Sequence, residues 1–286
     1  MSITFKQVEH TYNPDSPFSY AALKGIDLDI SEGKVTAIIG ETGSGKSTLV
    51  QHLNALLLPT GGELKILDKT IVAGSKPKEL KALRKQVGLV FQFPEYQLFE
   101  ETIAKDISFG PKNFGVSEED ALSQTKEILN IVGLDESYLE KSPFDLSGGQ
   151  KRRVAIAGIL AMEPTVLVLD EPTAGLDPQG AKDMMQLFVR VNSEYKKTVL
   201  IVTHDMEHVL NYCDEVIVIK DGTVKKKCDV QSFFEQVELL KELNINPPLV
   251  IRLREEFIQR GFHIDKSILD IESLAKAVAS EVSTYE

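Results

Sequence analysis

The chain has 286 residues, and 32 basic side chains against 43 acidic ones leave a formal net charge of −11. This acidic balance argues against a nucleic-acid partner, because a protein that binds a phosphate backbone needs a basic face. Hydrophobic residues make up 42% and charged residues 26% of the chain, as in an ordinary globular protein with a sizeable core.

The apolar stretches, the first ten residues and the cysteines together indicate the cellular location of the chain. Its longest apolar stretches, such as 154–162, fall short of the ~18 residues that a membrane-spanning helix needs. The opening MSITFKQVEH places Lys6 and Glu9 where a secretory signal has an apolar block. Cys213 and Cys228 form no metal-ligand spacing, so we expect reduced thiols. These features predict a cytosolic chain.

The predicted elements begin with strands. Alternating apolar residues from Ile3 to Val8 and from Leu23 to Ile30 predict antiparallel strands that cover one edge of a sheet. Helical periodicity at 48–58 and 180–191 alternates with further strands, which predicts a doubly wound α/β core with a parallel sheet. Those strands are continuous apolar runs, typical of strands buried on both faces, at 35–39, 87–91, 166–169 and 199–202.

Helical signals dominate two other parts of the chain. Between Phe93 and Leu146 the pattern is polar, with Ser117 as a helix cap and Gly133 as a stop, which predicts an inserted helical subdomain at about 94–150. After Val224 we expect no further strands, because apolar residues then recur at helical spacing. The pair Pro247 and Pro248 interrupts this helical tail.

Residues 40–47 read GETGSGKS and fit the pattern G-x-x-x-x-G-K-[ST] between a buried strand and a helix. The glycines let successive backbone amides point at phosphate oxygens, and the following helix adds its positive end. Lys46 would reach the β- and γ-phosphates of ATP, and Ser47 would bind Mg²⁺. The alternative is a glycine-rich turn that only caps a helix. We predict a cradle made of Gly40, Glu41, Thr42, Gly43, Ser44, Gly45, Lys46, Ser47 and Thr48.

Polar residues also follow the other buried strands. Asp170 and Glu171 end one strand, and we expect Asp170 to bind Mg²⁺ and Glu171 to act as the general base toward water. Gln92 follows a second strand, and we expect its side chain to contact the metal ion and the γ-phosphate. His204 follows a third and would hydrogen-bond the γ-phosphate, with a role in catalysis. In isolation, each of these residues would be interpreted as a polar cap.

A second glycine-rich turn opens a helix at Ser147, Gly148, Gly149 and Gln150. A nucleotide held by one cradle has little need of another from the same chain. We therefore expect a dimer in which each chain offers this turn to the γ-phosphate held by the other, so that ATP closes the pair and hydrolysis releases it. Asp177 would lie between the two sites.

The ordered set of cradle, Gln92, LSGGQ, LVLDEP, AGLD and His204 resembles the nucleotide-binding subunits of ATP-binding-cassette (ABC) systems over roughly residues 3–225. The resemblance implies a P-loop NTPase core and a head-to-tail ATP sandwich. It also implies that Tyr12 stacks on adenine, an interaction worth ~1–3 kcal/mol, with Phe18 and Tyr20 as alternatives. The expected domains are a nucleotide-binding domain at 1–229 and a helical tail at 230–286.

The stretch QFPEYQLFEETIAKDISFGP at 92–111 resembles ATPase subunits of energy-coupling factor (ECF) transporters, which take up vitamins or transition-metal ions. TYNPDSPFSYAAL and TGSGKSTLVQHLN are similar to the second of the two paralogous ATPases in those complexes. The resemblance implies a heterodimer with the paralogous ATPase, a membrane-embedded scaffold subunit and a separate substrate-binding membrane subunit. The chain would then sit peripherally on the cytoplasmic face of the cell membrane.

Two parts of the surface have competing interpretations. A helix near 95–106 would offer Glu95, Glu100, Glu101 and Asp106 to arginines of the scaffold, or would form a solvated acidic face. The tail would be a dimerisation arm, or would pack against its own core. Other functions considered are the ATPase of another ABC importer, and a soluble ABC ATPase outside transport.

Overall fold

The computed structural model describes residues 3–282. Its centre is a six-stranded sheet in which five parallel strands are flanked by one antiparallel edge strand, β10. All four predicted buried runs are strands of this sheet, because both of its faces are covered and only continuous apolar segments suit it. In spatial order the strands are β10 (Thr223–Asp229), β9 (Glu215–Lys220), β3 (Val35–Ile39), β8 (Thr198–Val202), β7 (Val166–Asp170) and β6 (Val87–Val90).

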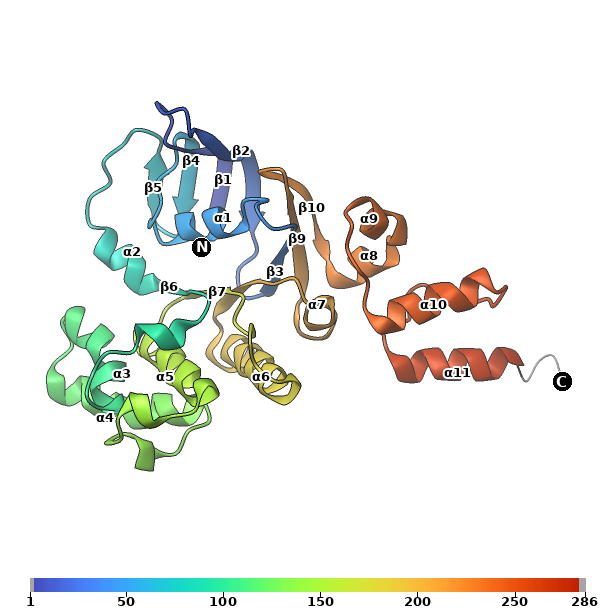
Figure 1. Cartoon of the computed structure of the whole chain (residues 1–286). Coiled ribbons are helices and arrows are strands. Elements are labelled where there is room, and N and C mark those ends of the chain that lie inside the picture. Colours follow the sequence, from blue (N-terminus) through green and yellow to red (C-terminus); the bar gives the residue numbers. More distant parts are fainter. Residues whose placement is uncertain (1–2, 283–286) are drawn as a thin grey trace.

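The predicted antiparallel strands belong to a second sheet of four strands (Figure 1). This sheet meets the edge of the first where β2 runs beside β10, and Lys227 Nζ donates to the Asp29 carbonyl at 2.8 Å. Two of its strands are short and carry charged residues, and one of them begins with a glycine pair, so the alternation that revealed the other two strands is weak. In spatial order the strands are β2 (Tyr20–Ile30), β1 (Ile3–Tyr12), β4 (Gly61–Ile66) and β5 (Lys69–Val72).

Helix α1 (Lys46–Leu53) lies between the two sheets (Figure 1). Its buried side chains Leu49, Val50 and Leu53 join one core cluster with residues of both sheets. The helix ends earlier than the predicted 48–58, because Ala55 has a left-handed backbone with a φ of +52°. The packing fixes the start of α1, and with it the glycine-rich loop, relative to the central sheet.

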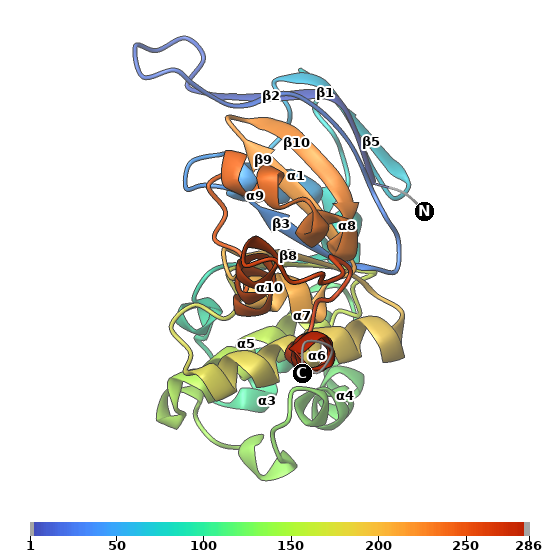
Figure 2. The same ribbon diagram turned by 90° about the vertical axis from the view of Figure 1, so that its right-hand side faces the viewer.

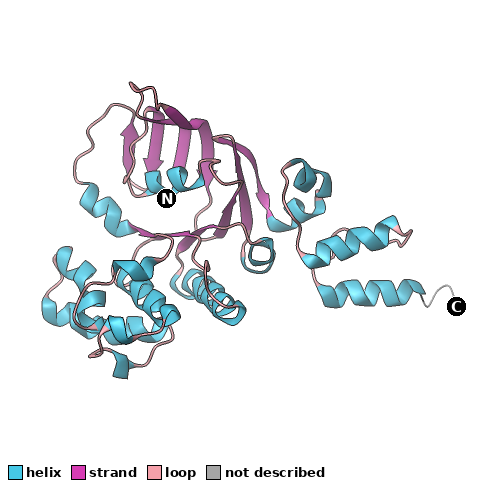
Figure 3. Ribbon diagram, viewed as in Figure 1, coloured by secondary structure: helices cyan, strands magenta, loops and turns pink. Residues whose placement is uncertain are grey.

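The opposite face of the central sheet carries the inserted helices, which Figure 3 shows gathered away from the strands. The predicted helix at 95–106 is wrong. Residues Pro94–Gln97 form one turn of 3-10 helix, and α3 begins only after Thr102, whose side chain accepts a hydrogen bond from the Lys105 amide. The helices of this layer are α3 (Ile103–Asn113), α4 (Glu118–Ile131), α5 (Gly148–Leu160) and α6 (Pro178–Tyr195), and α2 (Leu80–Gln86) precedes β6.

The chain after the central sheet is helical from Val230, as expected, but the strands end later than predicted. Strand β10 continues to Asp229, five residues beyond the expected end of the strands at Val224. The tail packs through Phe233, Phe234 and Ile251 in a core cluster with β3 and β9, and Figure 2 shows it beside the sheet. Pro247 and Pro248 separate its helices as predicted. Together with α7 (Met206–Tyr212) they are α8 (Val230–Glu235), α9 (Val237–Glu242), α10 (Leu249–Gln259) and α11 (Ile271–Val282).

Within residues 3–282, every helix is too short or too polar to span a bilayer.

Candidate functional site

The glycine-rich loop follows β3, and at two of its glycines neighbouring backbone leaves no room for a side chain. Gly40 has a φ of +152°, and a Cβ there would lie 2.0 Å from the Ile219 carbonyl oxygen. Gly45 has a φ of +107°, and a Cβ there would lie 2.6 Å from the Ala22 carbonyl oxygen. No side chain fits at such distances, so the loop is shaped by close approach of neighbouring backbone.

Lys46 stands at the first turn of α1 and folds back over the loop. Its Nζ donates to the carbonyl oxygens of Gly40 and Glu41, each at 2.8 Å. Burial lowers the pKa of Lys46, and the charges of Glu171 and Asp170 work against that shift. Ser44 Oγ is buried and has no hydrogen-bond partner among the described residues. The loop thus presents a desolvated cation and an unsatisfied hydroxyl, a fit for phosphate oxygens.

Two carboxylates stand at the end of β7. Burial raises the pKa of Asp170, against the effects of a hydrogen bond from Ser47 and the charge of Lys46. Glu171 has a left-handed backbone with a φ of +49°, a conformation that costs about 1–3 kcal/mol for a residue with a side chain. Glu171 Oε1 lies 2.9 Å from His204 Nδ1, which comes from the loop after β8. The structure therefore brings together the predicted base and the predicted histidine.

Gln92 completes this row of polar residues. It is exposed after β6, and the order β3-β8-β7-β6 makes the four strands neighbours in one parallel sheet. The carboxyl ends of parallel strands meet at one edge, so the cradle, His204, the carboxylate pair and Gln92 share that edge. Within residues 3–282 no three His, Cys, Asp or Glu side chains form a metal cluster.

The turn at Ser147 begins α5 with a capping box. Ser147 Oγ accepts from the Gln150 amide, and the Gln150 side chain accepts from the Ser147 amide at 3.0 Å. A Cβ added at Gly148 or Gly149 would meet no atom within 4 Å. The fold of this chain therefore does not require glycine at positions 148 and 149, in contrast to position 40. Bare backbone at an exposed helix start suits an anion that approaches from outside the chain.

Asp177 caps α6, since its Oδ1 accepts from the Gly180 amide at 2.8 Å. Two of the three aromatic residues considered for adenine reach the cradle. Tyr12 Oη lies 3.1 Å from Thr48 Oγ1, and Tyr20 Oη donates to the Gly43 carbonyl at 2.9 Å. Phe18 is 83% exposed in the loop between β1 and β2.

One residue of the site was missed by the sequence reasoning. Arg152 on α5 forms a bidentate pair with Glu95 at 2.8 and 3.0 Å. Its Nη1 also donates to the carbonyls of Pro172 and Ala174, which follow Glu171. Arg152 thus links the segment after Gln92, the Ser147 helix and the Glu171 loop. The available signal was its helical spacing with Ile156 and Ile159, which places an arginine on an apolar face of that helix.

This pair corrects the predicted acidic surface. Glu95 is turned inward to Arg152, and Asp106 accepts a hydrogen bond from the Glu100 amide at 3.0 Å. Glu101, just before α3, pairs with exposed Lys105 in the first turn of that helix. Beside these residues lies an apolar groove of about 290 Å³ between α3 and α5, lined by Leu98, Phe109, Phe114, Val154, Ile159 and Met162, among others.

Comparison with known proteins identifies the class. Residues 23–174 match the family model described as "ABC transporter", and the chain belongs to this family of ATP-binding transport ATPases. The chain is 40% identical to CbiO1 from Clostridium perfringens, described as part of the ABC transporter complex CbiONQ, with a TM-score of 0.74 over 88% of this chain and 98% of that one. It is 33% identical to the dimeric cassette MJ0796 bound to ADP and Pi, with a TM-score of 0.71 over 80% and 98%.

Curated relatives narrow the family. The chain is 53% identical to the energy-coupling factor transporter ATP-binding protein EcfA2 of Enterococcus faecalis over 96% of this chain and 95% of that protein. It is 50% identical to EcfA2 of Geobacillus kaustophilus over the full length of both. The chain thus falls among the energy-coupling factor transporter ATP-binding proteins, as the motifs predicted.

Proposed function

We propose that this chain is the ATP-hydrolysing subunit that powers uptake of a vitamin or metal ion by an ECF transporter. The observation that carries the proposal is the shared sheet edge, where four neighbouring strands deliver the cradle, His204, the carboxylate pair and Gln92. The kind of solute follows from the resemblance to ECF ATPases, and the relatives named as energy-coupling factor transporter proteins support the assignment to this class of transporter.

The residues at this edge divide the chemistry among them. Lys46 and the amides of 40–48 bind the phosphates, and Tyr12 stacks on adenine. Ser47, Gln92 and Asp170 supply oxygen atoms, the ligands that Mg²⁺ prefers, and the ion supplies positive charge against the phosphates when bound. Asp170 suits this role because burial already disfavours its uncompensated charge.

Glu171 is the general base, and it takes a proton from the attacking water. His204 Nδ1, at 2.9 Å from Glu171 Oε1, holds the carboxylate in place. His204 is itself 81% exposed, which leaves its ring accessible to the γ-phosphate and to a second chain. The unusual backbone of Glu171 supports a functional role, because strained conformations gather where a side chain must be aimed.

The second half of the nucleotide site comes from another chain. Gly148 and Gly149 face open space, so their amides are available to the γ-phosphate held by a partner. The partner we propose is the paralogous ATPase, in a head-to-tail heterodimer with Asp177 between the two sites. The related cassette MJ0796 forms a dimer in a post-hydrolysis state with ADP and Pi bound, which supports pairing of such cassettes around nucleotide.

Glu171→Gln tests the base directly. The variant should bind ATP, hydrolyse it about 10²–10⁴-fold more slowly and accumulate as the closed pair, because only proton transfer is removed. Rapid turnover in this variant would exclude Glu171 as the base. The sandwich is tested separately by crosslinking Ser47→Cys in one ATPase to a cysteine at the position of Ser147 in the other, with and without ATP; absence of the crosslink at saturating ATP would overturn the pairing.

The scaffold subunit is proposed to dock in the groove between α3 and α5. The groove has mostly apolar walls with Asp106 in its lining, and Glu100 and Glu101 directly precede α3, the helix that forms one of these walls. Charge reversal of Glu100 and Glu101 should weaken scaffold binding and uncouple transport, while ATP hydrolysis by the isolated ATPases persists. Unchanged scaffold binding would contradict the proposal.

The proposed membrane subunits of the complex determine where the chain is located in the cell. The chain would sit peripherally on the cytoplasmic face of the membrane through the scaffold, with a substrate-binding membrane subunit in the same complex. Copurification from membranes, followed by identification of the associated chains, tests this assembly.

The tail at 230–286 is proposed as a dimerisation arm of the nucleotide-free complex. It is attached to its own core through α8 and carries α10 and α11 side by side beyond it. Truncation after Asp229, followed by sizing of the nucleotide-free ATPase pair, should release the two subunits; a pair that stays intact would refute the arm.

A further inference from the structure

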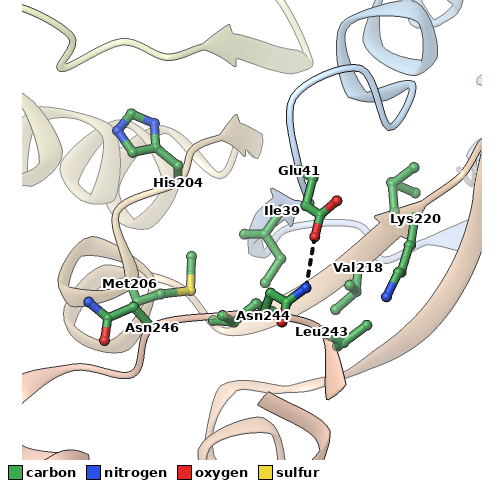
Figure 4. A pocket seen from close by; sticks show the side chains of 12 residues that line it. Ile39, Glu41, His204, Met206, Val218, Lys220, Leu243, Asn244 and Asn246 are labelled. Atoms are coloured by element: carbon green, nitrogen blue, oxygen red, sulfur yellow. Dashed lines mark hydrogen bonds between the residues drawn. The ribbon is translucent and has the colours of Figure 1, made fainter. Parts of the chain in front are cut away.

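The helical tail reaches the phosphate cradle. A cavity of about 250 Å³ lies between the start of the cradle, the His204 loop, β9 and the tail segment that joins α9 to α10 (Figure 4). Its polar lining consists of Glu41, His204, Lys220, Asn244 and Asn246. The cavity thus places polar tail residues beside two loops of the nucleotide site.

Three hydrogen bonds fasten this tail segment to the core. They run from Asn244 Nδ2 to Glu41 Oε1 at 3.4 Å, from the Leu249 amide to Glu207 Oε1 at 2.7 Å, and from Lys220 Nζ to the Glu242 carbonyl at 3.3 Å. One anchor is on the cradle, one is on α7 directly after the His204 loop, and one is on β9. The segment is therefore held at a defined place against the nucleotide site.

Glu41 is an unfavourable residue for a phosphate cradle. It is the second residue of the loop, and its carboxylate is negative, like the phosphates that the loop binds. Its backbone belongs to the cradle, since the Glu41 carbonyl accepts from Lys46 Nζ at 2.8 Å. Its side chain turns the other way, into the cavity, where Figure 4 shows it meeting the Asn244 amide.

Asn244 is suited to receive this carboxylate. Its backbone has a φ of +54°, in the left-handed region that asparagine tolerates better than most residues. This conformation aims its side chain at Glu41, and Lys220 adds a positive charge to the same cavity. The cavity therefore offers a hydrogen-bond donor and an opposite charge to a carboxylate that the cradle would repel.

We propose that Asn244 is a positioning residue for ATP: it holds the Glu41 carboxylate away from the phosphates, so that the tail contributes to nucleotide affinity. The proposal rests on the proposed role of residues 40–48 as the cradle. Without the Asn244 amide, Glu41 is free to swing toward the phosphates and repel them. The effect is larger for ATP than for ADP, because ATP carries the additional γ-phosphate charge.

The test is a double-mutant cycle in the purified full-length chain, with ATP and ADP affinities measured by calorimetry in the Glu171→Gln background. Asn244→Gly removes the side chain and keeps the left-handed backbone without strain. We expect it to weaken ATP binding about fivefold and ADP binding less than twofold. In a Glu41→Gln background, the same change should have no effect on either nucleotide.

Two further variants sharpen the result. Asn244→Asp keeps size and backbone preference but faces Glu41 with a like charge, so it should weaken ATP binding at least as much as Asn244→Gly. Asn246→Ala is the matched control, since Asn246 lines the same cavity and its side chain has no hydrogen bond to the cradle among the described residues. We expect wild-type affinity from it.

The proposal is overturned if Asn244→Gly leaves ATP affinity unchanged. It is also overturned if ATP and ADP weaken equally in both Glu41 backgrounds, since that result describes general damage to the fold. Failure of the cradle itself is distinguished by Lys46→Ala. If that variant binds ATP normally, the cradle is refuted; if it loses ATP while Asn244→Gly does not, only the role of Asn244 fails.

Discussion

Arg152→Met is the most informative single change that the structure suggests. The Arg152 side chain is 3% exposed and that of Glu95 14%, and four hydrogen bonds leave the guanidinium, two to Glu95 and one each to the carbonyls of Pro172 and Ala174. Methionine keeps the apolar volume but removes every donor. The Glu95 carboxylate is then left buried without its partner.

Removal of one member of a buried ion pair costs about 3–5 kcal/mol, most of it from the charge left behind. The carbonyls of Pro172 and Ala174 can form hydrogen bonds with water instead, so their loss of Arg152 adds little. We therefore expect the variant to lose about 3–5 kcal/mol of unfolding free energy at pH 7 in total. For a chain of this size each kcal/mol lowers the unfolding temperature by about 2 °C, which predicts a decrease of about 6–10 °C. Turnover should fall as well, because Arg152 braces the loop that follows Glu171.

The pH dependence of stability shows whether the unpaired Glu95 carboxylate causes the loss in Arg152→Met. Burial favours a higher pKa for Glu95, but the hydrogen bonds and charge of Arg152 outweigh it, and the pKa lies below the ordinary value of 4.5. A lowered pKa stabilises the wild type above that ordinary value, and this stability is lost as the pH falls through the lowered pKa. In Arg152→Met burial becomes the main influence on the pKa of Glu95 and exceeds the remaining backbone hydrogen bond, so the variant becomes less stable as the pH rises.

Calorimetric unfolding of both proteins between pH 4 and pH 7 measures this difference, which should widen as the pH rises. Arg152→Met with Glu95→Gln should recover about half of the loss, because no buried charge remains. Lys151→Met, one residue away and without an ion pair among residues 3–282, is the control. A loss below about 1 kcal/mol, or one that does not change with pH, would refute this account of the pair.

Three other predictions use residues with contrasting surroundings. Gly148→Ala should unfold at the wild-type temperature or above yet lose ATP-dependent pairing, because the added Cβ meets no atom within 4 Å in its own chain. Gly40→Ala should instead lower the unfolding temperature, because the added Cβ would lie 2.0 Å from the Ile219 carbonyl oxygen. Burial raises the pKa of Cys213, which keeps some exposed surface, to about 12, so a thiol reagent at pH 8 should label it far more slowly in the native than in the denatured chain; equal labelling rates of Cys213 in the two states would contradict this prediction. Arg254→Met should increase protease cleavage within the tail before the core is cut, because Arg254 is fully buried and donates to the carbonyls of Phe234, Lys266 and Ile268. An unchanged cleavage pattern would show that these hydrogen bonds do not hold the tail in place.

Local patterns predicted the nucleotide edge well. The runs at 35–39, 87–91, 166–169 and 199–202 are strands of one sheet, and the residues after them meet because parallel strands end at a common edge. The strands β4 and β5 escaped prediction, because both are short and carry charged residues, and β4 begins with two glycines. The helix expected at 95–106 was wrong, because Glu95 is held by a residue 57 positions away rather than by its neighbours.

The sequence by itself determined the class of protein and the chemistry of its site, because phosphate binding requires glycines, a lysine and a hydroxyl at fixed short spacing, which is a local property of the chain. Tertiary structure alone decided which acids are available and what the tail contacts. Glu95 became an internal partner of Arg152, and Asn244 came within 3.4 Å of Glu41 across 203 positions of sequence. Such pairings depend on how helices pack on a sheet, and no spacing along the chain encodes them.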